Sequence, residues 1–257
     1  MIFDTHAHYD DEQFDIDREE LLGKMQEAGI ETIVDVGASI ETTKKALELA
    51  HRYDFIYAAV GVHPSEVAEL DDDSIELLRG LSRDENCVAI GEIGLDYHWP
   101  EPEPELQKLW FKRQLNLARQ ENLPVIIHSR DAAADTLEIL RDERAEEIGG
   151  VVHCFSYSKE VARECLKMGF YIGIGGVLTF KNARKMVEVM EDTPMDRILL
   201  ETDCPYLAPE PFRGKRNSSL YLPYVVQKMA EIKGISADEV ISITRENART
   251  MYGLNKQ

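Results

Sequence analysis

The chain has 257 residues, of which 44% are hydrophobic and 30% charged, and this composition fits an ordinary globular protein with a substantial core. Its formal net charge of −19 opposes nonspecific binding to duplex nucleic acid, although a local basic patch could still bind a few phosphates. The N-terminal segment lacks the basic and apolar regions of a signal peptide, and no apolar run approaches the length of a membrane span. We therefore expect a cytoplasmic protein without a membrane partner.

Short apolar runs alternate with amphipathic stretches along the whole chain. The runs are nearly continuous in Val, Ile and Ala, as expected for parallel strands that are covered on both faces. In chain order, the predicted strands span residues 2–6, 32–37, 55–61, 87–93, 124–128, 150–153, 170–174 and 198–201.

The stretches between the predicted strands have the spacing of helices with one buried face. Ala46, Leu47 and Ala50 show this spacing after the second strand. Alternating strands and helices imply βαβ units with right-handed crossovers. Eight such units, without a linker or a shift in composition, predict an α/β fold: a (β/α)8 TIM barrel that forms a single domain over residues 1–257.

Two predicted loops stand out. The acidic, Pro-rich segment 98–105 follows the fourth strand and is interpreted either as a stiff connector or as a wall over a site. The Pro-containing segment 204–217 follows the eighth strand and leads to two C-terminal helices.

A pair of histidines ends the first predicted strand. His6 and His8 are two residues apart, so their side chains point to the same face, which in a parallel barrel is the interior. Two imidazoles crowded there are an expensive choice for a core unless they bind a metal ion. By itself, the H-x-H pair is also compatible with a purely structural role.

Four more ionisable residues stand at the ends of separate strands. Glu92 lies in the fourth, His128 and His153 end the fifth and sixth, and Asp203 follows the eighth. Because the C-terminal ends of barrel strands converge on one mouth, all six side chains should meet there. Six ligands are too many for one tetrahedral ion but suit two divalent ions that share a carboxylate. The mixed nitrogen and oxygen donors leave Zn²⁺, Mn²⁺, Fe²⁺, Ni²⁺ and Mg²⁺ open.

Short motifs follow one another along essentially the whole chain. They are DTHAH (4–8), GVHP (61–64), GEIGLDY (91–97), HSRD (128–131), HCFS (153–156), ETDCP (201–205) and FRGKRN (212–217). In this order they resemble the TatD-related deoxyribonucleases of the metal-dependent hydrolase superfamily. The resemblance implies hydrolysis of phosphodiester bonds in DNA, often as an exonuclease, and a requirement for divalent cations.

The resemblance also implies two ligand sets that are bridged by Glu92. The first set is His6, His8, Glu92 and Asp203, and the second is Glu92, His128 and His153. Independently of the resemblance, water on a zinc-like ion has its pKa lowered to about 7. Asp203 could hold the ion with one oxygen and orient or deprotonate that water with the other.

Other residues are candidates for supporting roles on the same rim. His63 ends the third strand and is expected to contact substrate phosphate or donate a proton, the alternative being a supporting or capping histidine. Glu201 shares the strand parity of Asp203 and is expected to support a histidine ligand, whereas Asp4 is expected to be packed structurally.

Basic residues near the predicted mouth are candidates for binding substrate phosphate. Arg130 shares strand parity with the ligand that precedes it on the fifth strand. Arg213, Lys215 and Arg216 form a compact basic cluster after the eighth strand, where TIM barrels often bind phosphate. Arginine suits phosphate through paired hydrogen bonds, although the cluster could also be a solvated run of charge.

The sequence therefore favours a monomeric enzyme with two divalent ions that cleaves phosphodiester bonds, most simply a 3′-5′ exodeoxyribonuclease acting on single-stranded DNA ends. A substrate held by a few phosphates at one end reconciles DNA with the acidic chain. Two alternatives stay open: a metal-dependent hydrolase of amides or carboxylic esters, and a metal-binding scaffold without catalytic activity.

Overall fold

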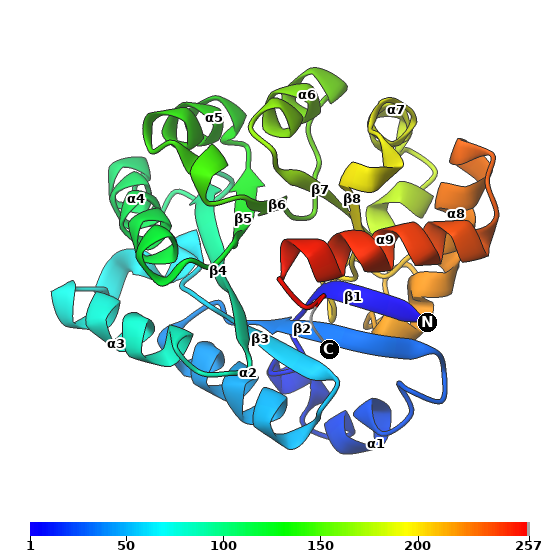
Figure 1. The fold of residues 1–257 in the computed structure, drawn as a ribbon, viewed down its shortest axis with the longest axis horizontal. Helices are drawn as coiled ribbons and strands as arrows, with labels where there is room; N and C mark the ends of the chain where they lie inside the picture. Colours follow the sequence, from blue (N-terminus) through cyan, green and yellow to red (C-terminus); the bar gives the residue numbers. More distant parts are fainter. Residues whose placement is uncertain (256–257) are drawn as a thin grey trace.

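The computed structural model describes residues 1–255, and its strands form one parallel sheet in the order β1 to β8 (Figure 1). The strands are β1 (Ile2–Ala7), β2 (Ile30–Val36), β3 (Ile56–Val60), β4 (Cys87–Asp96), β5 (Val125–Arg130), β6 (Gly150–Val152), β7 (Tyr171–Ile174) and β8 (Ile198–Leu200). Every predicted strand is confirmed, and β4 and β5 extend beyond their predicted ends to Asp96 and Arg130.

The ring closes between β1 and the segment that follows β8. The Asp203 N–H donates to the His6 carbonyl (2.9 Å), and the His8 N–H donates to the Cys204 carbonyl (2.8 Å). Ala7 and Cys204 accordingly form a parallel bridge. The protein is therefore a (β/α)8 TIM barrel, as the sequence predicts.

Helices surround the strands as an outer ring (Figure 1). The α-helices are α1 (Arg18–Leu22), α2 (Ile40–Arg52), α3 (Asp72–Ser82), α4 (Pro104–Glu121), α5 (Ala133–Asp142), α6 (Lys159–Lys167), α7 (Arg184–Asp192), α8 (Leu222–Lys233) and α9 (Ala237–Met251). The 3-10 helices are η1 (Glu12–Phe14), η2 (Pro64–Glu69), η3 (Ala145–Glu147), η4 (Gly176–Thr179), η5 (Met195–Arg197) and η6 (Ser219–Tyr221). Across residues 1–255, no helix has both the length and the apolar character needed to cross a membrane.

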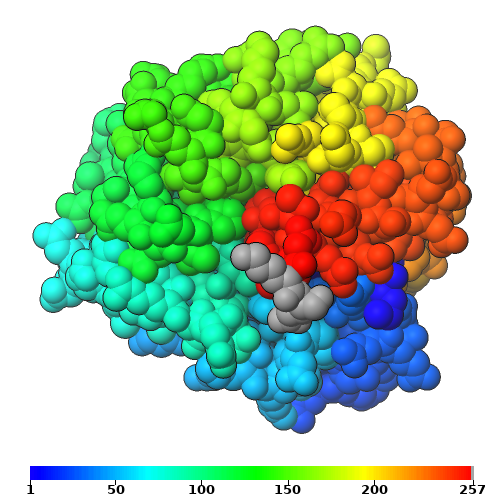
Figure 2. Space-filling view, in the orientation of Figure 1, coloured from blue at the N-terminus to red at the C-terminus, as the bar shows by residue number. Residues whose placement is uncertain are grey.

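The last helix, α9, closes one end of the barrel. Its Met251 and Tyr252, the residue after it, pack with inward-facing residues such as Ile126 and Leu199. The Tyr252 hydroxyl donates to the Thr5 carbonyl (2.7 Å). Figure 2 shows the side chains of α9 over the middle of this face. The other end of the barrel, formed by the C-terminal ends of the strands, carries the predicted site residues.

Candidate metal centre at the barrel mouth

Four side chains from the ends of β1, β4 and β8 bring donor atoms to one point. His6 Nε2 lies 3.1 Å from His8 Nε2, 3.5 Å from Glu92 Oε2 and 3.6 Å from Asp203 Oδ1. His8 Nε2 lies 3.4 Å from Asp203 Oδ1 and 3.7 Å from Glu92 Oε2. Ligands about 2.1 Å from a tetrahedral ion lie about 3.4 Å from one another. The spacing of these four atoms therefore fits a single divalent ion.

The other oxygen of Glu92 belongs to a second group of donors. Glu92 Oε1 lies 2.7 Å from His128 Nδ1 and 2.5 Å from His153 Nε2, and these two nitrogens are 3.2 Å apart. His63 Nε2 is more distant, at 4.0 Å from the same oxygen. The two carboxylate oxygens of Glu92 thus face different donor sets, the arrangement expected of a carboxylate shared by two ions.

The tautomers of two histidines are set by hydrogen bonds on their far sides. His8 Nδ1 lies 2.7 Å from the Val36 carbonyl, which can only accept, so this nitrogen carries a proton. His128 Nε2 is likewise held by the Asp96 carboxylate at 3.1 Å. In the neutral rings, His8 Nε2 and His128 Nδ1 are therefore left with lone pairs that face the donor sets. This is the usual preparation of a histidine for metal binding.

The charges at the mouth are balanced between carboxylates and imidazoles. Burial alone would lower the pKa of His8, but the hydrogen bond that His8 donates to Asp203 and the charges of Glu92 and Asp203 raise it to about 10. Burial is likewise outweighed at His128, whose pKa is raised to about 9 by Asp96 and Glu92. Although burial opposes it, the histidines hold the pKa of Glu92 well below its usual value. The carboxylates therefore stay ionised and attract cations to this position.

These pKa shifts predict a strong pH dependence of metal binding. Because the pKa values of His8 and His128 lie near 10 and 9, the metal-free protein keeps protons on these rings at neutral pH. A metal ion must displace those protons, so we expect its apparent affinity to rise by about tenfold per pH unit for each proton released between pH 6 and 9. Calorimetric titration of Mn²⁺ into metal-free protein, in two buffers of different ionisation enthalpy, measures the release. Equal heats in the two buffers would contradict the prediction.

His63 lies beside the second donor set with a fixed tautomer. Its ring centroid is 4.2 Å from that of His128, and burial together with the charge of His128 lowers its pKa to about 3. The Ser65 backbone N–H donates to His63 Nδ1 (3.1 Å), so the proton of the neutral ring sits on Nε2. His63 can therefore donate a hydrogen bond into the mouth but is not a base there at neutral pH.

Asp96 was not singled out from the sequence, although it lies in the GEIGLDY motif. Its Oδ2 contacts His128 Nε2, and its Oδ1 accepts the His98 backbone N–H (2.9 Å). The sequence feature that could have identified Asp96 is its position four residues after Glu92, on a strand that extends further than predicted. Asp96 therefore positions His128 from behind.

Glu201 and Asp4 support the site in different ways. Glu201 Oε1 accepts the Cys154 N–H (2.5 Å) and lies 3.9 Å from His153 Nδ1, too far for a direct hydrogen bond. The Asp4 carboxylate accepts the hydroxyls of Thr202 (2.7 Å) and Ser219 (2.6 Å), and this ties β1 to the chain after β8.

Gly173 leaves the space that Glu201 occupies. A Cβ at this position would lie 2.4 Å from Glu201 Oε2 and 2.9 Å from Oε1, and the Glu201 side chain is buried, so its carboxylate would have to shift. We expect Gly173→Ala to lower the free energy of unfolding by about 1–3 kcal/mol through overpacking. Gly80→Ala is the matched control, because a Cβ there meets nothing within 4 Å and α3 should gain about 0.5–1 kcal/mol. Urea unfolding of both variants measures this, and equal stability would be inconsistent with the crowding.

The predicted basic residues do not share one environment. Arg130 is exposed at the end of β5. The Arg213 guanidinium lies over the Phe180 ring at 4.3 Å. The Lys215 ammonium is 5.7 Å from the Phe212 ring. Arg130 ends β5, and Arg213 and Lys215 lie on the loop after β8, so all three remain candidates for phosphate contacts.

Arg216 differs from the other three basic residues. Its two terminal nitrogens pair with the Asp17 carboxylate at 2.8 and 2.5 Å, and one of them also donates to the Gln13 carbonyl. The charge of Arg216 is therefore compensated within the protein, and its fork of donors is already in use. We leave Arg216 out of the proposed phosphate contacts and assign it to anchoring the loop after β8.

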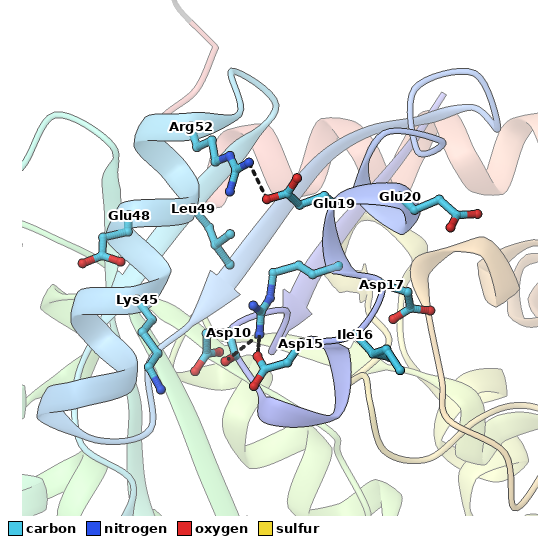
Figure 3. Close-up of a pocket in the computed structure, with 11 residues that line it drawn as sticks. Asp10, Asp15, Ile16, Asp17, Glu19, Glu20, Lys45, Glu48, Leu49 and Arg52 are labelled. Carbon is cyan, nitrogen blue, oxygen red and sulfur yellow. Dashed lines mark hydrogen bonds and ion pairs between the residues drawn. The ribbon is translucent and has the colours of Figure 1, made fainter.

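A depression of about 610 Å³ lies on the outer surface around α1 and α2 (Figure 3). Its lining includes six carboxylates but only three basic side chains. Figure 3 shows Arg52 directed at Glu19, an ion pair of 2.6 Å, and Arg18 is paired with Asp15 in the same way. The remaining charge is negative, so this depression does not suit a substrate that carries phosphate.

Comparisons with known proteins place the chain in a family. A family model described as TatD related DNase matches residues 3–253. The chain is 49% identical to the uncharacterized metal-dependent hydrolase YabD of Bacillus subtilis, over 99% of this chain and 100% of that protein. It is 35% identical to the 3′-5′ ssDNA/RNA exonuclease TatD of Cronobacter sakazakii, over 98% of this chain and 97% of that protein. The crystal structure of YJJV, a TatD homolog from Escherichia coli, matches with a TM-score of 0.92 at 33% identity, over 98% of both chains. The chain therefore belongs to the TatD-related DNase family of metal-dependent hydrolases.

Proposed function

We propose that this protein is a 3′-5′ exonuclease that hydrolyses phosphodiester bonds at single-stranded DNA ends with two divalent ions. The observation that carries the proposal is the division of Glu92 between two donor sets, because paired ions suit an in-line displacement at phosphorus. The exonuclease name of the Cronobacter relative supports the substrate and the polarity. The first set of ligands is His6, His8, Glu92 and Asp203, and the second is Glu92, His128 and His153.

Divalent ions held in these sets would supply a water that ionises near neutral pH and positive charge for the phosphoryl oxygens. Asp203 is suited to orienting the attacking water and accepting its proton, because its side chain is 17% exposed at the mouth. Although burial opposes it, the hydrogen bond accepted from His8 and the nearby histidine charges lower the pKa of Asp203, so the group is an ionised acceptor. His63 Nε2–H would donate to a phosphoryl oxygen, and Arg130 would bind a neighbouring phosphate.

The direct test is digestion of a single-stranded oligonucleotide labelled at either its 5′ or its 3′ end. Purified protein should be inactive in EDTA and should shorten the 5′-labelled strand step by step from its 3′ end when Mg²⁺ or Mn²⁺ is restored. Stepwise loss from the 5′ end would overturn the polarity. Activity that persists in EDTA would overturn the metal-dependent mechanism. Metal-loaded, folded protein that cleaves no DNA but hydrolyses amides or carboxylic esters would overturn the nuclease assignment.

Arg213 and Lys215 give a test of phosphate recognition. We expect the double variant Arg213→Ala, Lys215→Ala to lose roughly 10- to 100-fold in kcat/KM on DNA, because a charge-assisted hydrogen bond contributes about 1.5–3 kcal/mol. Hydrolysis of a small neutral ester, if the protein has this side activity, should change less than twofold. Lys228→Ala, on the surface of α8, removes one positive charge outside the loop and serves as control. An equal loss in the control would refute a specific contact.

A further inference from the structure

Two large aromatic side chains are exposed in the loops at the mouth. Trp99, in the loop between β4 and α4, is 56% exposed, and Tyr206, in the loop after β8, is 49% exposed. The chain's other tryptophan, Trp110, is only 2% exposed, as is usual for so large an apolar side chain. Neither the fold nor the ligand sets explain why two rings are left open to solvent here.

Both rings are tied to the candidate metal centre through short chains of contacts. The Trp99 ring packs edge-on against His98 at 4.7 Å, and the His98 backbone donates to Asp96, which holds His128. The Tyr206 ring stands edge-on to the ligand His8 at 6.5 Å.

Tyr206 is also held by hydrogen bonds at both ends. Its backbone N–H donates to the Asp203 carbonyl (2.8 Å), and its hydroxyl donates to Asp11 Oδ2 (2.9 Å). The ring is thereby fixed with part of its surface open to solvent, so little side-chain entropy remains to be lost when a ligand stacks on it.

The order of the strands places the two rings on opposite sides of the mouth. In a ring of eight strands, β4 and β8 are four positions apart in either direction, so the loops that follow them face each other across the barrel axis. The donor sets, which are built from the ends of strands around the same ring, lie between the two loops. A linear ligand whose reacting atom reaches the metal centre would therefore extend toward a ring on each side.

The charge immediately around the two rings favours contacts with bases, whereas the proposed phosphate contacts Arg213 and Lys215 lie farther along the loop after β8. The loop that carries Trp99 also carries Glu101 and Glu103, and Tyr206 contacts Asp11. Phosphates are repelled by such carboxylates, whereas the neutral faces of bases are not. Stacking on aromatic side chains is a sequence-tolerant way to bind single strands, and it does not depend on a basic surface.

We propose that Trp99 and Tyr206 stack on the two bases that flank the scissile phosphate, one on each side. This inference rests on the proposed function and deepens it. It assigns specificity for unpaired nucleotides to the two rings, because a base that is paired within a duplex is stacked on its neighbours and cannot lie against a protein ring. It also explains how a chain of net charge −19 holds DNA, since much of the affinity would come from the bases.

The test combines protein variants with substrates that lack a base. Cleavage of a single-stranded oligothymidylate is compared with that of strands in which the last or the second-last nucleotide is an abasic tetrahydrofuran. For the unchanged protein, we expect each base removal to lower kcat/KM by about tenfold or more. Trp99→Ala should cause a similar loss on intact DNA but no further loss with one of the abasic strands. Tyr206→Leu should behave the same way with the other abasic strand.

Conservative and distant variants separate stacking from unfolding. Trp99→Phe and Tyr206→Phe keep a ring and should retain most of the activity, whereas Leu109→Ala, a 46% exposed position on α4, should change nothing. If an alanine or leucine variant lost activity on the abasic strands by the same factor as on intact DNA, the ring and the base would not interact, and the stacking proposal would be overturned. Absence of cleavage of intact DNA by the unchanged protein would instead overturn the proposed function, so the two failures are distinct.

Salt dependence gives an independent readout on binding. If the bases carry much of the affinity, the logarithm of the association constant should fall with the logarithm of salt concentration with a slope no steeper than about −1.4, the value for two phosphates on a single strand. Fluorescence anisotropy of a labelled oligonucleotide in Ca²⁺ measures the slope. A slope of about −3.5 or steeper, equivalent to five phosphates, would overturn the base-centred binding.

Discussion

Glutamine in place of Glu92 should abolish hydrolysis almost completely, by roughly 10³-fold or more, and should lower the amount of bound metal in both sets. Removal of a partner behind a ligand typically costs 10- to 100-fold, and the loss of a shared carboxylate should exceed that. The reason is geometric. One oxygen of Glu92 faces His6 and His8, and the other faces His128 and His153. The amide nitrogen of glutamine would replace one of these oxygens and could not bind the ion there. The lost negative charge would lower the metal affinity of both sets.

Initial rates and metal content by mass spectrometry measure this effect together. Asp96→Asn is the matched control, because the Asp96 carboxylate contacts the far nitrogen of His128 and the His98 backbone N–H but no donor atom of the first set. This variant should lose 10- to 100-fold in rate without loss of the first ion. Circular dichroism of the metal-free proteins checks that each variant is folded. A Glu92→Gln protein that retains two ions per chain would contradict the shared role of this carboxylate.

Asp203→Asn should reduce kcat by about 10³-fold while KM changes little. The asparagine keeps an oxygen that can face His6 and His8, but it no longer offers an ionised oxygen to the attacking water. The loss is therefore expected in the chemical step rather than in substrate binding. Steady-state kinetics on an oligonucleotide, with metal held in excess, separates the two parameters.

The pH profile adds a second criterion for Asp203. Because the carboxylate of Asp203 has a lowered pKa, the unchanged protein, with metal in excess to keep the histidines deprotonated, should lose activity only when the pH falls far enough to protonate that carboxylate. In the asparagine variant, the part of this loss of activity at low pH that comes from protonation of Asp203 should be absent. A defect that is confined to KM would show that Asp203 serves only in binding.

The sequence predicted the site best where the strands alternate regularly. On β5 and β6, Ile126 and Val151 face the interior, and His128 and His153 follow each of them by two residues. Regular alternation therefore carries His128 and His153 to the mouth, as their position at strand ends indicates. Asp203 differs, because it lies beyond the end of β8 with a positive φ of 58°, so alternation along the strand does not extend to it.

Alternation fails at β4, and this explains what could not be derived from spacing alone. Ala89 faces the interior, which by simple alternation would turn Glu92 toward the helices. The β4–β5 pairing shifts register between Ile90 and Ile93, and Glu92 faces the mouth instead. Only the resemblance of the surrounding motif identified Glu92 as bridging.

The partners of charged and titratable side chains also could not be predicted from the sequence. The ion pair of Arg216 with Asp17 joins residues that are far apart in the chain. The local sequence shows only that Arg216 stands beside Arg213 and Lys215, and therefore groups it with them as a phosphate contact. The tautomer of His63 likewise depends on a hydrogen bond that only the local backbone geometry at Ser65 reveals.

The closure of the barrel has a consequence for how the protein matures. The backbone bonds that join β1 to the chain after β8 involve His6, His8 and Asp203 themselves, so the first donor set exists only once the two ends of the barrel have met. During synthesis, a nascent chain that stops before Asp203 has its first histidines in place but lacks their partner. Metal loading should therefore be a late event, after nearly the whole chain has left the ribosome, and truncated products should remain without the first ion.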